Sequence, residues 1–224
     1  MEIDFNKYPL PKRLRHHTTP NLYFKLSELK EKPGFYPPAV EEMDWEEVFI
    51  NGKQPDMLDV GCGKGVFLLN MSEKYPDKNI LGIELRKAAV EWINGVVRGE
   101  GIPNGAAIWY SVVNGLHFIE DKSIEKVFYL FPDPWPKRKH LKRRAFNEEF
   151  LSDIYRVLKD DGHFYLATDV PEVDSYHKKV LDVFGKFDYG IVQSDNQWLF
   201  PVTNKEKFCR KENISFFRLI CSKK

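Results

Sequence analysis

The amino-acid sequence predicts an α/β fold in which a mostly parallel sheet carries helices on both faces. Two observations support this prediction. From residue 56 onward, short apolar segments alternate with amphipathic segments of helical length, which is typical of βαβ units. In addition, the residues best suited to bind ligands directly follow these apolar segments, and parallel sheets bind ligands beyond the carboxyl ends of their strands. The 224 residues suffice for one sizeable core.

The individual elements are predicted from the spacing of apolar residues. Strands are expected at residues 56–60, 79–84, 106–113, 124–131, 162–168 and 214–221. Helices are expected at residues 64–75, 86–98, 144–158 and 172–184. The second helix has Ala89 and Ile93 on one inward face, and the third has Phe146, Phe150 and Ile154 at helical spacing.

Residues 1–50 differ in character from the rest of the chain. Prolines and charged residues are frequent there, and Pro33, Gly34, Pro37 and Pro38 interrupt any periodicity. We therefore predict an N-terminal arm over residues 1–50 and one domain over residues 51–224.

The composition excludes several classes of protein. Hydrophobic residues make up 42% and charged residues 30% of the chain, and no apolar run approaches the ~18 residues of a membrane span. The N-terminus lacks the apolar core of a signal peptide. Cys62, Cys209 and Cys221 lack metal-type spacing, which indicates reduced thiols in a cytoplasmic protein. The His16–His17 pair has no further ligand-type neighbours, so no metal is expected.

Positive charge is concentrated in two clusters although the net charge is only +1. Residues 137–144 hold six Lys or Arg, and a second cluster comprises Lys12, Arg13, Arg15, His16 and His17. Local basic strips on a near-neutral protein suit a polyanion that binds and then leaves.

A glycine turn follows the first predicted strand and reads Gly61-Cys62-Gly63-Lys64-Gly65. Glycines permit positive φ and let a ligand approach the backbone closely. Glu84 ends the next strand, where an acid can accept hydrogen bonds from both hydroxyls of a ribose. An ordinary tight turn or a solvated glutamate would explain each feature alone, so the prediction rests on their combination.

The spacing of the glycines separates two kinds of cofactor. The dinucleotide fingerprint is G-x-G-x-x-G, whereas this turn reads G-x-G-x-G with Asp59 two residues before it. An acid is a poor neighbour for a pyrophosphate but a good one for the cationic end of an amino acid. The turn resembles motif I of class I S-adenosylmethionine-dependent methyltransferases, and Glu84 resembles their ribose-binding acid. Asn114 falls where such enzymes often contact adenine, although Asn114-Gly115 is equally an ordinary turn.

This resemblance implies a Rossmann-like class I fold with a mostly parallel seven-stranded sheet. It also implies S-adenosyl-L-methionine as co-substrate, bound by Asp59, Gly61, Gly63, Gly65, Glu84 and Asn114, and no metal.

The most specific segment reads Phe131-Pro132-Asp133-Pro134-Trp135-Pro136 and runs into the basic cluster that ends at Arg144. Each proline fixes φ near −65° and biases the preceding residue toward extended geometry. The turn therefore presents Asp133 and Trp135 in a narrow range of directions. An acid and an indole beside cations favour a base-binding pocket next to a phosphate-binding surface. Trp135 either stacks on a base or packs against the sheet edge, and the sequence does not choose between them.

Pro-Asp-Pro-Trp followed by a basic stretch resembles the hallmark of the tRNA (guanine-N7-)-methyltransferases of the TrmB type. The resemblance covers roughly residues 13–224, with weaker matches at residues 13–17, 167–169 and 201–206. It implies methyl transfer to N7 of the variable-loop guanine numbered 46 in tRNA, forming 7-methylguanosine, and an arm that contacts RNA. It is compatible with a monomer, a homodimer or a partner subunit.

Asp133 is the catalytic residue that this resemblance implies. Its carboxylate could accept hydrogen bonds from the Watson–Crick edge of guanine and favour the positive charge of the methylated ring. The other implied substrate or RNA contacts are Lys137, Lys139, His140, Lys142, Arg143, Arg144, Asp169, Thr203 and Glu206.

Structural explanations compete with several of these assignments. The basic cluster could be the solvated start of a helix, although cations are disfavoured there. Asp169 could be a helix N-cap, and Thr203 with Glu206 fits a capping box.

Two departures from the family pattern concern the C-terminal loop and the glycine turn. Lys207-Phe208-Cys209 and Asn213 stand where the family usually has an Arg-Gly pair and a later glycine, and Asp59 stands where a glutamate is frequent.

The alternatives are a class I methyltransferase of another RNA site and a non-catalytic RNA-binding relative. The basic cluster argues against a small-molecule substrate, and the glycine spacing argues against an NAD-dependent oxidoreductase.

Overall fold

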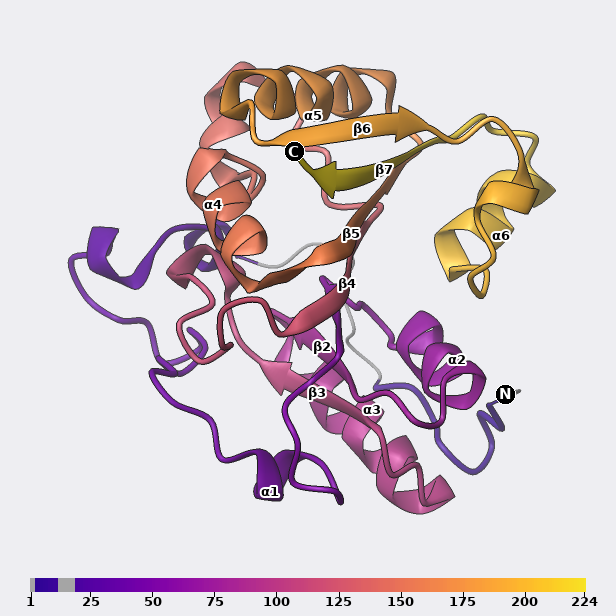
Figure 1. Ribbon diagram of the computed structural model, residues 1–224. Helices are drawn as coiled ribbons and strands as arrows, with labels where there is room; N and C mark the ends of the chain where they lie inside the picture. The colour runs from indigo at the N-terminus through magenta and orange to yellow at the C-terminus, as the bar shows by residue number, and fades with distance from the viewer. Residues whose placement is uncertain (1–2, 12–18) are drawn as a thin grey trace.

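The computed structural model describes residues 3–11 and 19–224, which form a single seven-stranded sheet with helices on both faces (Figure 1). The strands are β1 (Met57–Val60), β2 (Ile80–Glu84), β3 (Gly105–Trp109), β4 (Ile124–Leu130), β5 (Leu158–Thr168), β6 (Phe187–Ile191) and β7 (Phe217–Lys223). Their order is β3-β2-β1-β4-β5-β7-β6. Strands β1 to β5 run parallel, and β7 is antiparallel to β5 and β6. The predicted mostly parallel, seven-stranded sheet is confirmed.

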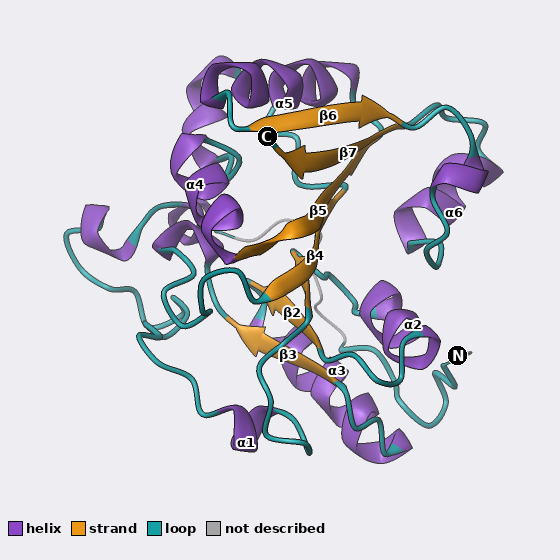
Figure 2. Cartoon of the chain, in the orientation of Figure 1, coloured by secondary structure: helices purple, strands orange, loops and turns teal. Residues whose placement is uncertain are grey.

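Helices cover the two faces of this sheet (Figure 2). The α-helices are α1 (Trp45–Val48), α2 (Val66–Lys74), α3 (Lys87–Glu100), α4 (Glu148–Val157), α5 (Pro171–Phe184) and α6 (Asn204–Lys211). The 3₁₀ helices are η1 (Pro20–Tyr23), η2 (Leu26–Glu28), η3 (Val112–Asn114), η4 (Arg138–Arg143) and η5 (Asp195–Gln197). Helices α2 and α3 pack on one face, and α4 and α5 pack on the other.

Strand β4 shows how the sequence divides the core between the two faces. Val127 and Tyr129 belong to the apolar cluster that includes α4 and α5, whereas Phe128 belongs to the cluster under α2 and α3. Successive side chains of a strand point to opposite faces, so a continuous apolar segment supplies both clusters at once.

The direction of the strand order changes between β1 and β4, the two neighbouring central strands. The chain leaves β1 toward β2 and β3 on one side, and β4 and β5 lie on the other. Ligands of open parallel sheets bind in the crevice outside the carboxyl ends of the strands at such a point. The glycine turn after β1 and the Pro-Asp-Pro-Trp turn after β4 therefore meet at one crevice.

Several predicted boundaries differ from the structure. The strand expected at residues 106–113 ends at Trp109, and the helix expected from Arg144 begins at Glu148. The Asn147 side chain accepts from the Phe150 N–H, and two glutamates fill the first helical turn, which favours the later start. The basic cluster therefore does not form the N-terminus of α4. It forms η4, a separate 3₁₀ helix that ends before α4 begins. Strand β6 and helices α1 and α6 were not predicted.

The described part of the predicted arm lies against the domain. Residues 3–11 pack on α3, where the Phe5 and Trp92 rings are stacked at 6.2 Å and Lys7 pairs with Glu100 at 2.7 Å. On the opposite face, Trp45 contacts Phe49 and Phe118. The predicted RNA contacts at Lys12, Arg13, Arg15, His16 and His17 lie outside the described residues.

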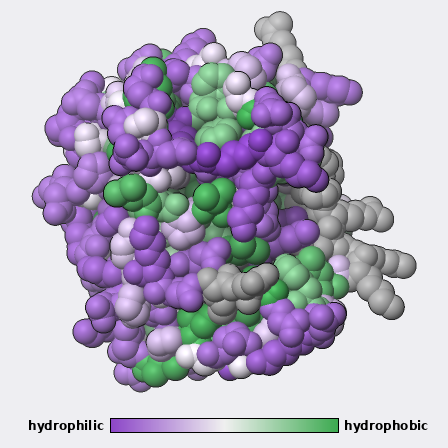
Figure 3. Space-filling model, turned by 90° about the vertical axis from the view of Figure 1, so that its right-hand side faces the viewer, coloured by the Kyte–Doolittle hydropathy of each residue, from purple (hydrophilic) through white to green (hydrophobic). Residues whose placement is uncertain are grey.

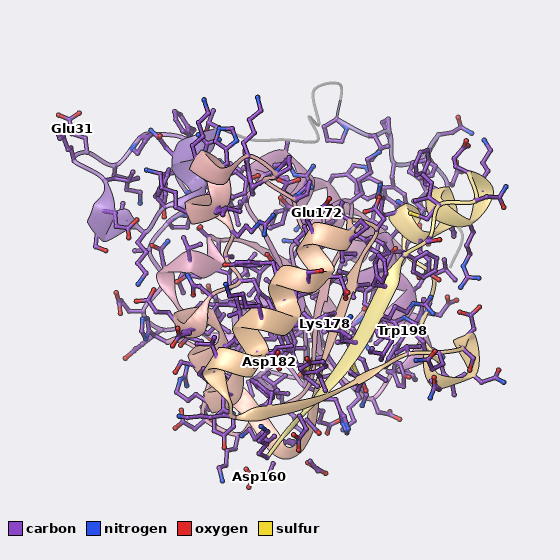
Figure 4. All side chains as sticks on the ribbon, turned by 90° about the horizontal axis from the view of Figure 1, so that it is seen from above. Glu31, Asp160, Glu172, Lys178, Asp182 and Trp198 are labelled. Atoms are coloured by element: carbon purple, nitrogen blue, oxygen red, sulfur yellow. The ribbon has the colours of Figure 1, made fainter. Side chains whose placement is uncertain are left out.

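The outer surface of α5 is charged, as the labelled Glu172, Lys178 and Asp182 show (Figure 4). Its inner surface buries Val173, His177 and Leu181. Within residues 3–11 and 19–224, no helix combines the length and the apolar character needed to cross a membrane.

Candidate active site

The glycine turn forms the first wall of the crevice. Gly61, Gly63 and Gly65 have φ of +78°, +62° and +68°, where a side chain would be strained. A Cβ at Gly65 would lie 2.6 Å from Ile93, so this glycine lets α3 pack against the start of α2. A Cβ at Gly61 would meet no atom within 4 Å, which leaves that side of the turn open to a ligand.

Asp59 lies in β1 directly before the turn and is 3% exposed. Burial, followed by the nearby Glu84 carboxylate, raises the pKa of Asp59 to about 7. Its Oδ2 atom is buried and accepts no hydrogen bond from the residues that the structure describes. Since an unsatisfied buried carboxylate oxygen is costly, Asp59 is suited to receive a cationic group of a ligand.

Glu84 ends β2 and is held by four N–H groups. The Gly63 and Arg86 backbone N–H groups donate to it at 2.9 and 3.0 Å, and Arg86 Nε and Nη2 donate at 2.8 and 3.0 Å. Both carboxylate oxygens are thus engaged by the protein itself. A ribose that binds Glu84 through two hydroxyls must displace the Arg86 side chain.

The Pro-Asp-Pro-Trp turn forms the second wall, and its backbone is strained. Phe131, directly before the turn, and Trp135, its last residue, have φ of +52° and +40°, a region that residues with side chains seldom adopt. Such strain persists where the surroundings hold it, and it is frequent at ligand sites. Here it directs Asp133 and Trp135 into the crevice.

Arg144 holds this turn from behind. Its Nε and Nη2 atoms donate to the Pro134 carbonyl at 2.9 and 2.7 Å, and its guanidinium lies 4.6 Å from the centre of the Tyr176 ring. Both hydrogen bonds go to the protein, so the observed contacts of Arg144 position the turn, whereas the sequence suggested a contact to RNA.

Trp135 is packed between three side chains. The Arg143 guanidinium lies 4.7 Å from the centre of its ring, and the Tyr23 and His140 rings meet it edge-on at 4.8 and 5.6 Å. Tyr23 also donates its hydroxyl to Asp133 Oδ2 at 2.5 Å.

The C-terminal segment closes the remaining side. Asp169, after β5, pairs with Lys205 of α6 at 2.7 Å. The competing explanation of Asp169 as a helix N-cap is wrong, because Val170 occupies that position and its N–H is accepted by Thr168. Thr203 caps α6 by accepting from the Glu206 N–H at 3.0 Å.

Glu206 is 2% exposed, and its carboxylate accepts from Arg210 and Arg218. This buried ion pair anchors α6 to β7. Glu206 does not line the crevice, so its observed contacts are structural, whereas the family resemblance implied a substrate contact.

These walls enclose a pocket of about 900 Å³, within the range typical of ligand sites. The predicted site residues that line it are Asp59, Gly61, Gly63, Glu84, Asp133, Arg143, Arg144, Asp169 and Thr203. The pocket therefore brings the glycine turn and the Asp133 turn together, as the sequence predicted. On the face that carries α6, apolar side chains gather in patches between hydrophilic bands (Figure 3); the half-exposed Phe208 belongs to both α6 and the pocket.

The structure places the other predicted site residues outside this pocket. Gly65 is the N-cap of α2. Asn114 does not line the pocket: its Oδ1 accepts from the Leu26 N–H at 2.8 Å, and its Nδ2 donates to the Tyr36 hydroxyl oxygen at 2.9 Å. It thus holds the N-terminal segment, and Ser111 and Val112 line the pocket near the predicted adenine position.

The remaining cations form a basic surface beside the pocket. Lys137, Lys139 and Lys142 are exposed, as a phosphate-binding surface requires. Partial burial, followed by the neighbouring Arg143, Lys139 and Lys137 cations, lowers the pKa of His140 from its ordinary value of 6.5.

Sequence reasoning missed Arg86 and Tyr23. Arg86 lies two residues after Glu84, so its spacing from the acid could have indicated an ion pair. Tyr23 carries no such signal, since it lies 110 residues from Asp133. Among the described residues, no cluster of His, Cys, Asp and Glu could hold a metal ion.

The pocket fits S-adenosyl-L-methionine. The buried Asp59 oxygen without a protein donor suits an ammonium group, the space at Gly61 admits a ligand against the backbone, and Glu84 ends β2 where a ribose is bound in this class of fold.

Comparisons with known proteins identify the family of this chain. The family model described as "Putative methyltransferase" matches residues 53–219. A tRNA (guanine-N(7)-)-methyltransferase from Lactobacillus gasseri is 32% identical over 154 residues, which are 68% of this chain and 71% of that protein. A structure described as an antibiotic-related methyltransferase aligns with a TM-score of 0.58 and 16% identity, over 85% of this chain and 98% of that one.

A second solved structure, the 16S rRNA methyltransferase KamB, aligns with a TM-score of 0.55 and 15% identity over 76% of this chain and 87% of that one. At such identities the two structures show the fold alone, which is that of class I methyltransferases. The family follows from the sequence comparisons, which cover three quarters and two thirds of the chain. The chain belongs to the tRNA (guanine-N7-)-methyltransferase family, of the TrmB type.

Proposed function

We propose that the protein transfers the methyl group of S-adenosyl-L-methionine to N7 of guanine 46 in the variable loop of tRNA, forming 7-methylguanosine. The observation that carries the proposal is that Asp59 and Asp133 line one pocket. The Asp59 carboxylate has the environment of a cation-binding group. The Asp133 carboxylate follows β4 on the neighbouring side of the crevice. The activity for which the relatives are named and the basic surface beside the pocket support the same assignment.

On the donor side, Asp59 receives the ammonium group, and Gly61 and Gly63 let the ligand lie against the backbone. Glu84 binds the ribose hydroxyls after Arg86 has moved from its carboxylate. Ser111 and Val112 contact the adenine, because Asn114 is hydrogen-bonded to the N-terminal segment and does not line the pocket.

On the acceptor side, Asp133 binds the Watson–Crick edge of guanine. The N7 atom already has an in-plane lone pair, so no base has to remove a proton before transfer. The N7–methyl bond forms as the sulfur–methyl bond breaks, S-adenosyl-L-homocysteine leaves, and the purine becomes cationic. The negative charge of Asp133 is stabilising for that developing charge, because a preorganised group in a pocket is worth more than one in water.

The protein's remaining task is to position the two partners. Arg144 fixes the carbonyl of Pro134, and thereby the direction of Asp133. Lys137, Lys139, Lys142 and Arg143 bind phosphates of the tRNA. The arm of residues 1–50 contributes further RNA contacts, and the Asp169–Lys205 pair and Thr203 place α6 beside the bound base.

The test is a nucleoside analysis. The protein is incubated with unmodified tRNA and S-adenosyl-L-methionine labelled in its methyl group, and the tRNA is digested to nucleosides. We expect the label in 7-methylguanosine alone. A label in another nucleoside would mean a class I methyltransferase of another RNA site, and binding of tRNA without any transfer would mean a non-catalytic relative.

A further inference from the structure

Tyr23, from a segment outside the sheet, occupies the acceptor side of the pocket. Its hydroxyl donates to Asp133 Oδ2 at 2.5 Å, and its ring meets the Trp135 ring edge-on, with 4.8 Å between centres and 78° between planes. An aromatic ring that donates a hydrogen bond to Asp133 has the chemistry expected of the guanine edge itself. A guanine that uses this oxygen and this indole therefore cannot bind while the phenol is in place.

The segment around Tyr23 is docked by a few contacts to the ends of the sheet. Leu22 is 3% exposed, and its carbonyl accepts from the Ser111 hydroxyl at 2.9 Å. The Leu26 N–H donates to Asn114 at 2.8 Å, and the Phe24 carbonyl accepts from the Tyr36 hydroxyl at 2.7 Å. These contacts fix the backbone on both sides of Tyr23, so the phenol is held at Asp133 by a folded segment.

Tyr23 also stands between two cavities. It lines the pocket that holds Asp59 and Asp133, and it lines an adjoining cavity of about 1,020 Å³. The lining of this second cavity carries both signs of charge, with Lys25, Lys142 and Arg144 beside Glu28, Glu41, Glu148, Glu149 and Asp153. Tyr23 is one of the residues that line both spaces, so displacement of its phenol enlarges the space beside Asp133.

We propose that Tyr23 holds the acceptor-base position of the RNA-free protein and is exchanged for guanine when tRNA binds. This inference rests on the function proposed above. The exchange lowers the apparent affinity for tRNA, because only the fraction of molecules with a displaced phenol can accept the base. In return, Asp133 has a hydrogen-bond partner whether or not RNA is bound.

The test compares two phenol deletions in the full chain. Tyr23→Phe removes the hydroxyl at Asp133 and keeps the ring. Tyr189→Phe is the matched control, since the Tyr189 hydroxyl also donates to a carboxylate, Asp182 at 3.1 Å, but belongs to β6 and does not line the pocket. Steady-state methyl transfer gives KM for unmodified tRNA and kcat, and the nucleoside product is identified in every assay.

We expect Tyr23→Phe to lower KM for tRNA about fivefold to tenfold. The substitution removes a hydrogen bond to a carboxylate only from the RNA-free state, in which the Tyr23 ring occupies the base position. Tyr189→Phe should leave KM unchanged. A KM for Tyr23→Phe that is unchanged or raised would overturn the exchange, and a raised KM would make Tyr23 a residue that helps to bind the base. Failure of the proposed function is distinguishable, because it appears as a product other than 7-methylguanosine in the wild-type assay.

Discussion

At the scale of single residues, Asp59 links donor binding to pH. Burial raises the pKa of Asp59 to about 7, so the carboxyl is largely protonated in the free protein below pH 7. Because the cationic end of the donor requires the ionised form, we expect Kd for S-adenosyl-L-methionine to rise about tenfold per pH unit below pH 7. Isothermal titration between pH 5.5 and 7.5 measures this, and a Kd that is independent of pH would contradict it.

The same residue is expected to cost stability. A carboxyl whose pKa rises from 3.8 to about 7 on folding holds its proton more tightly in the folded state. Ionisation of Asp59 therefore leaves the free energy of unfolding unchanged below pH 3.8. It lowers that free energy as the pH rises from 3.8 to about 7, by at most roughly 4 kcal/mol. We predict that Asp59→Asn raises Tm at pH 8 and abolishes donor binding, with little effect on Tm at pH 4.

Asp133 is predicted to act through its charge. Asp133→Asn keeps the size and the hydrogen-bond acceptor but loses the negative charge that stabilises the cationic purine. We expect the single-turnover rate at saturating tRNA to fall about 100-fold, while Kd for S-adenosyl-L-methionine stays within twofold. A rate near that of the wild type would refute the electrostatic role.

At the scale of elements, the strained turn after β4 depends on Arg144. Arg144→Lys replaces two hydrogen bonds to the Pro134 carbonyl with one at most, so Asp133 should lose its fixed direction. We predict a roughly tenfold loss of kcat with donor affinity unchanged. Arg156→Lys is the matched control, because Arg156 donates to the Ile119 and Leu116 carbonyls away from the pocket. It should lower Tm and leave kcat intact.

The elements that sequence reasoning found are those with a clear apolar period. Strands β1 to β5 and helices α2, α3 and α5 were predicted within a few residues because one or both of their faces are buried. Strand β6 was missed because Asp188, Gly190 and Ile191 are exposed, so this strand has no continuous buried apolar face. Helix α6 was missed because it is mostly charged and is anchored through Glu206 and Arg218, an ion pair between distant parts of the chain.

At the scale of the whole molecule, the charge distribution sets the response to salt. Lys139 and Lys142 are exposed beside the pocket, and removing one phosphate-binding cation makes the plot of log K against log salt shallower by about 0.7 to 0.9. We predict that Lys139→Glu with Lys142→Glu weakens tRNA binding and reduces that slope by about 1 to 2. Lys53→Glu with Lys179→Glu changes the net charge by the same amount away from the pocket. This control should change the tRNA affinity and the salt slope less than Lys139→Glu with Lys142→Glu does.

The composition of the site was predictable only in part. Asp59 and Glu84 lie at the carboxyl ends of β1 and β2, and Asp133 follows β4; since parallel strands bind ligands beyond these ends, their meeting could be foreseen. The contacts of Tyr23 and Asn114 could not, because their partners lie 110 and 88 residues away along the chain, whereas the spacing of Arg86 from Glu84 could have indicated an ion pair. The basic cluster was predicted as one surface, but Arg144 turns inward to hold a carbonyl, and the sequence contains no sign of that direction.

Substitution of one atom in the substrate tests the central claim most directly. A tRNA with 7-deazaguanosine at position 46 keeps the Watson–Crick edge that Asp133 binds and has a C–H group in place of N7. We expect the wild-type protein to bind this tRNA as it binds the unmodified one and to transfer no methyl group to it. Undiminished transfer to the substituted tRNA would contradict methylation at N7 of that guanine.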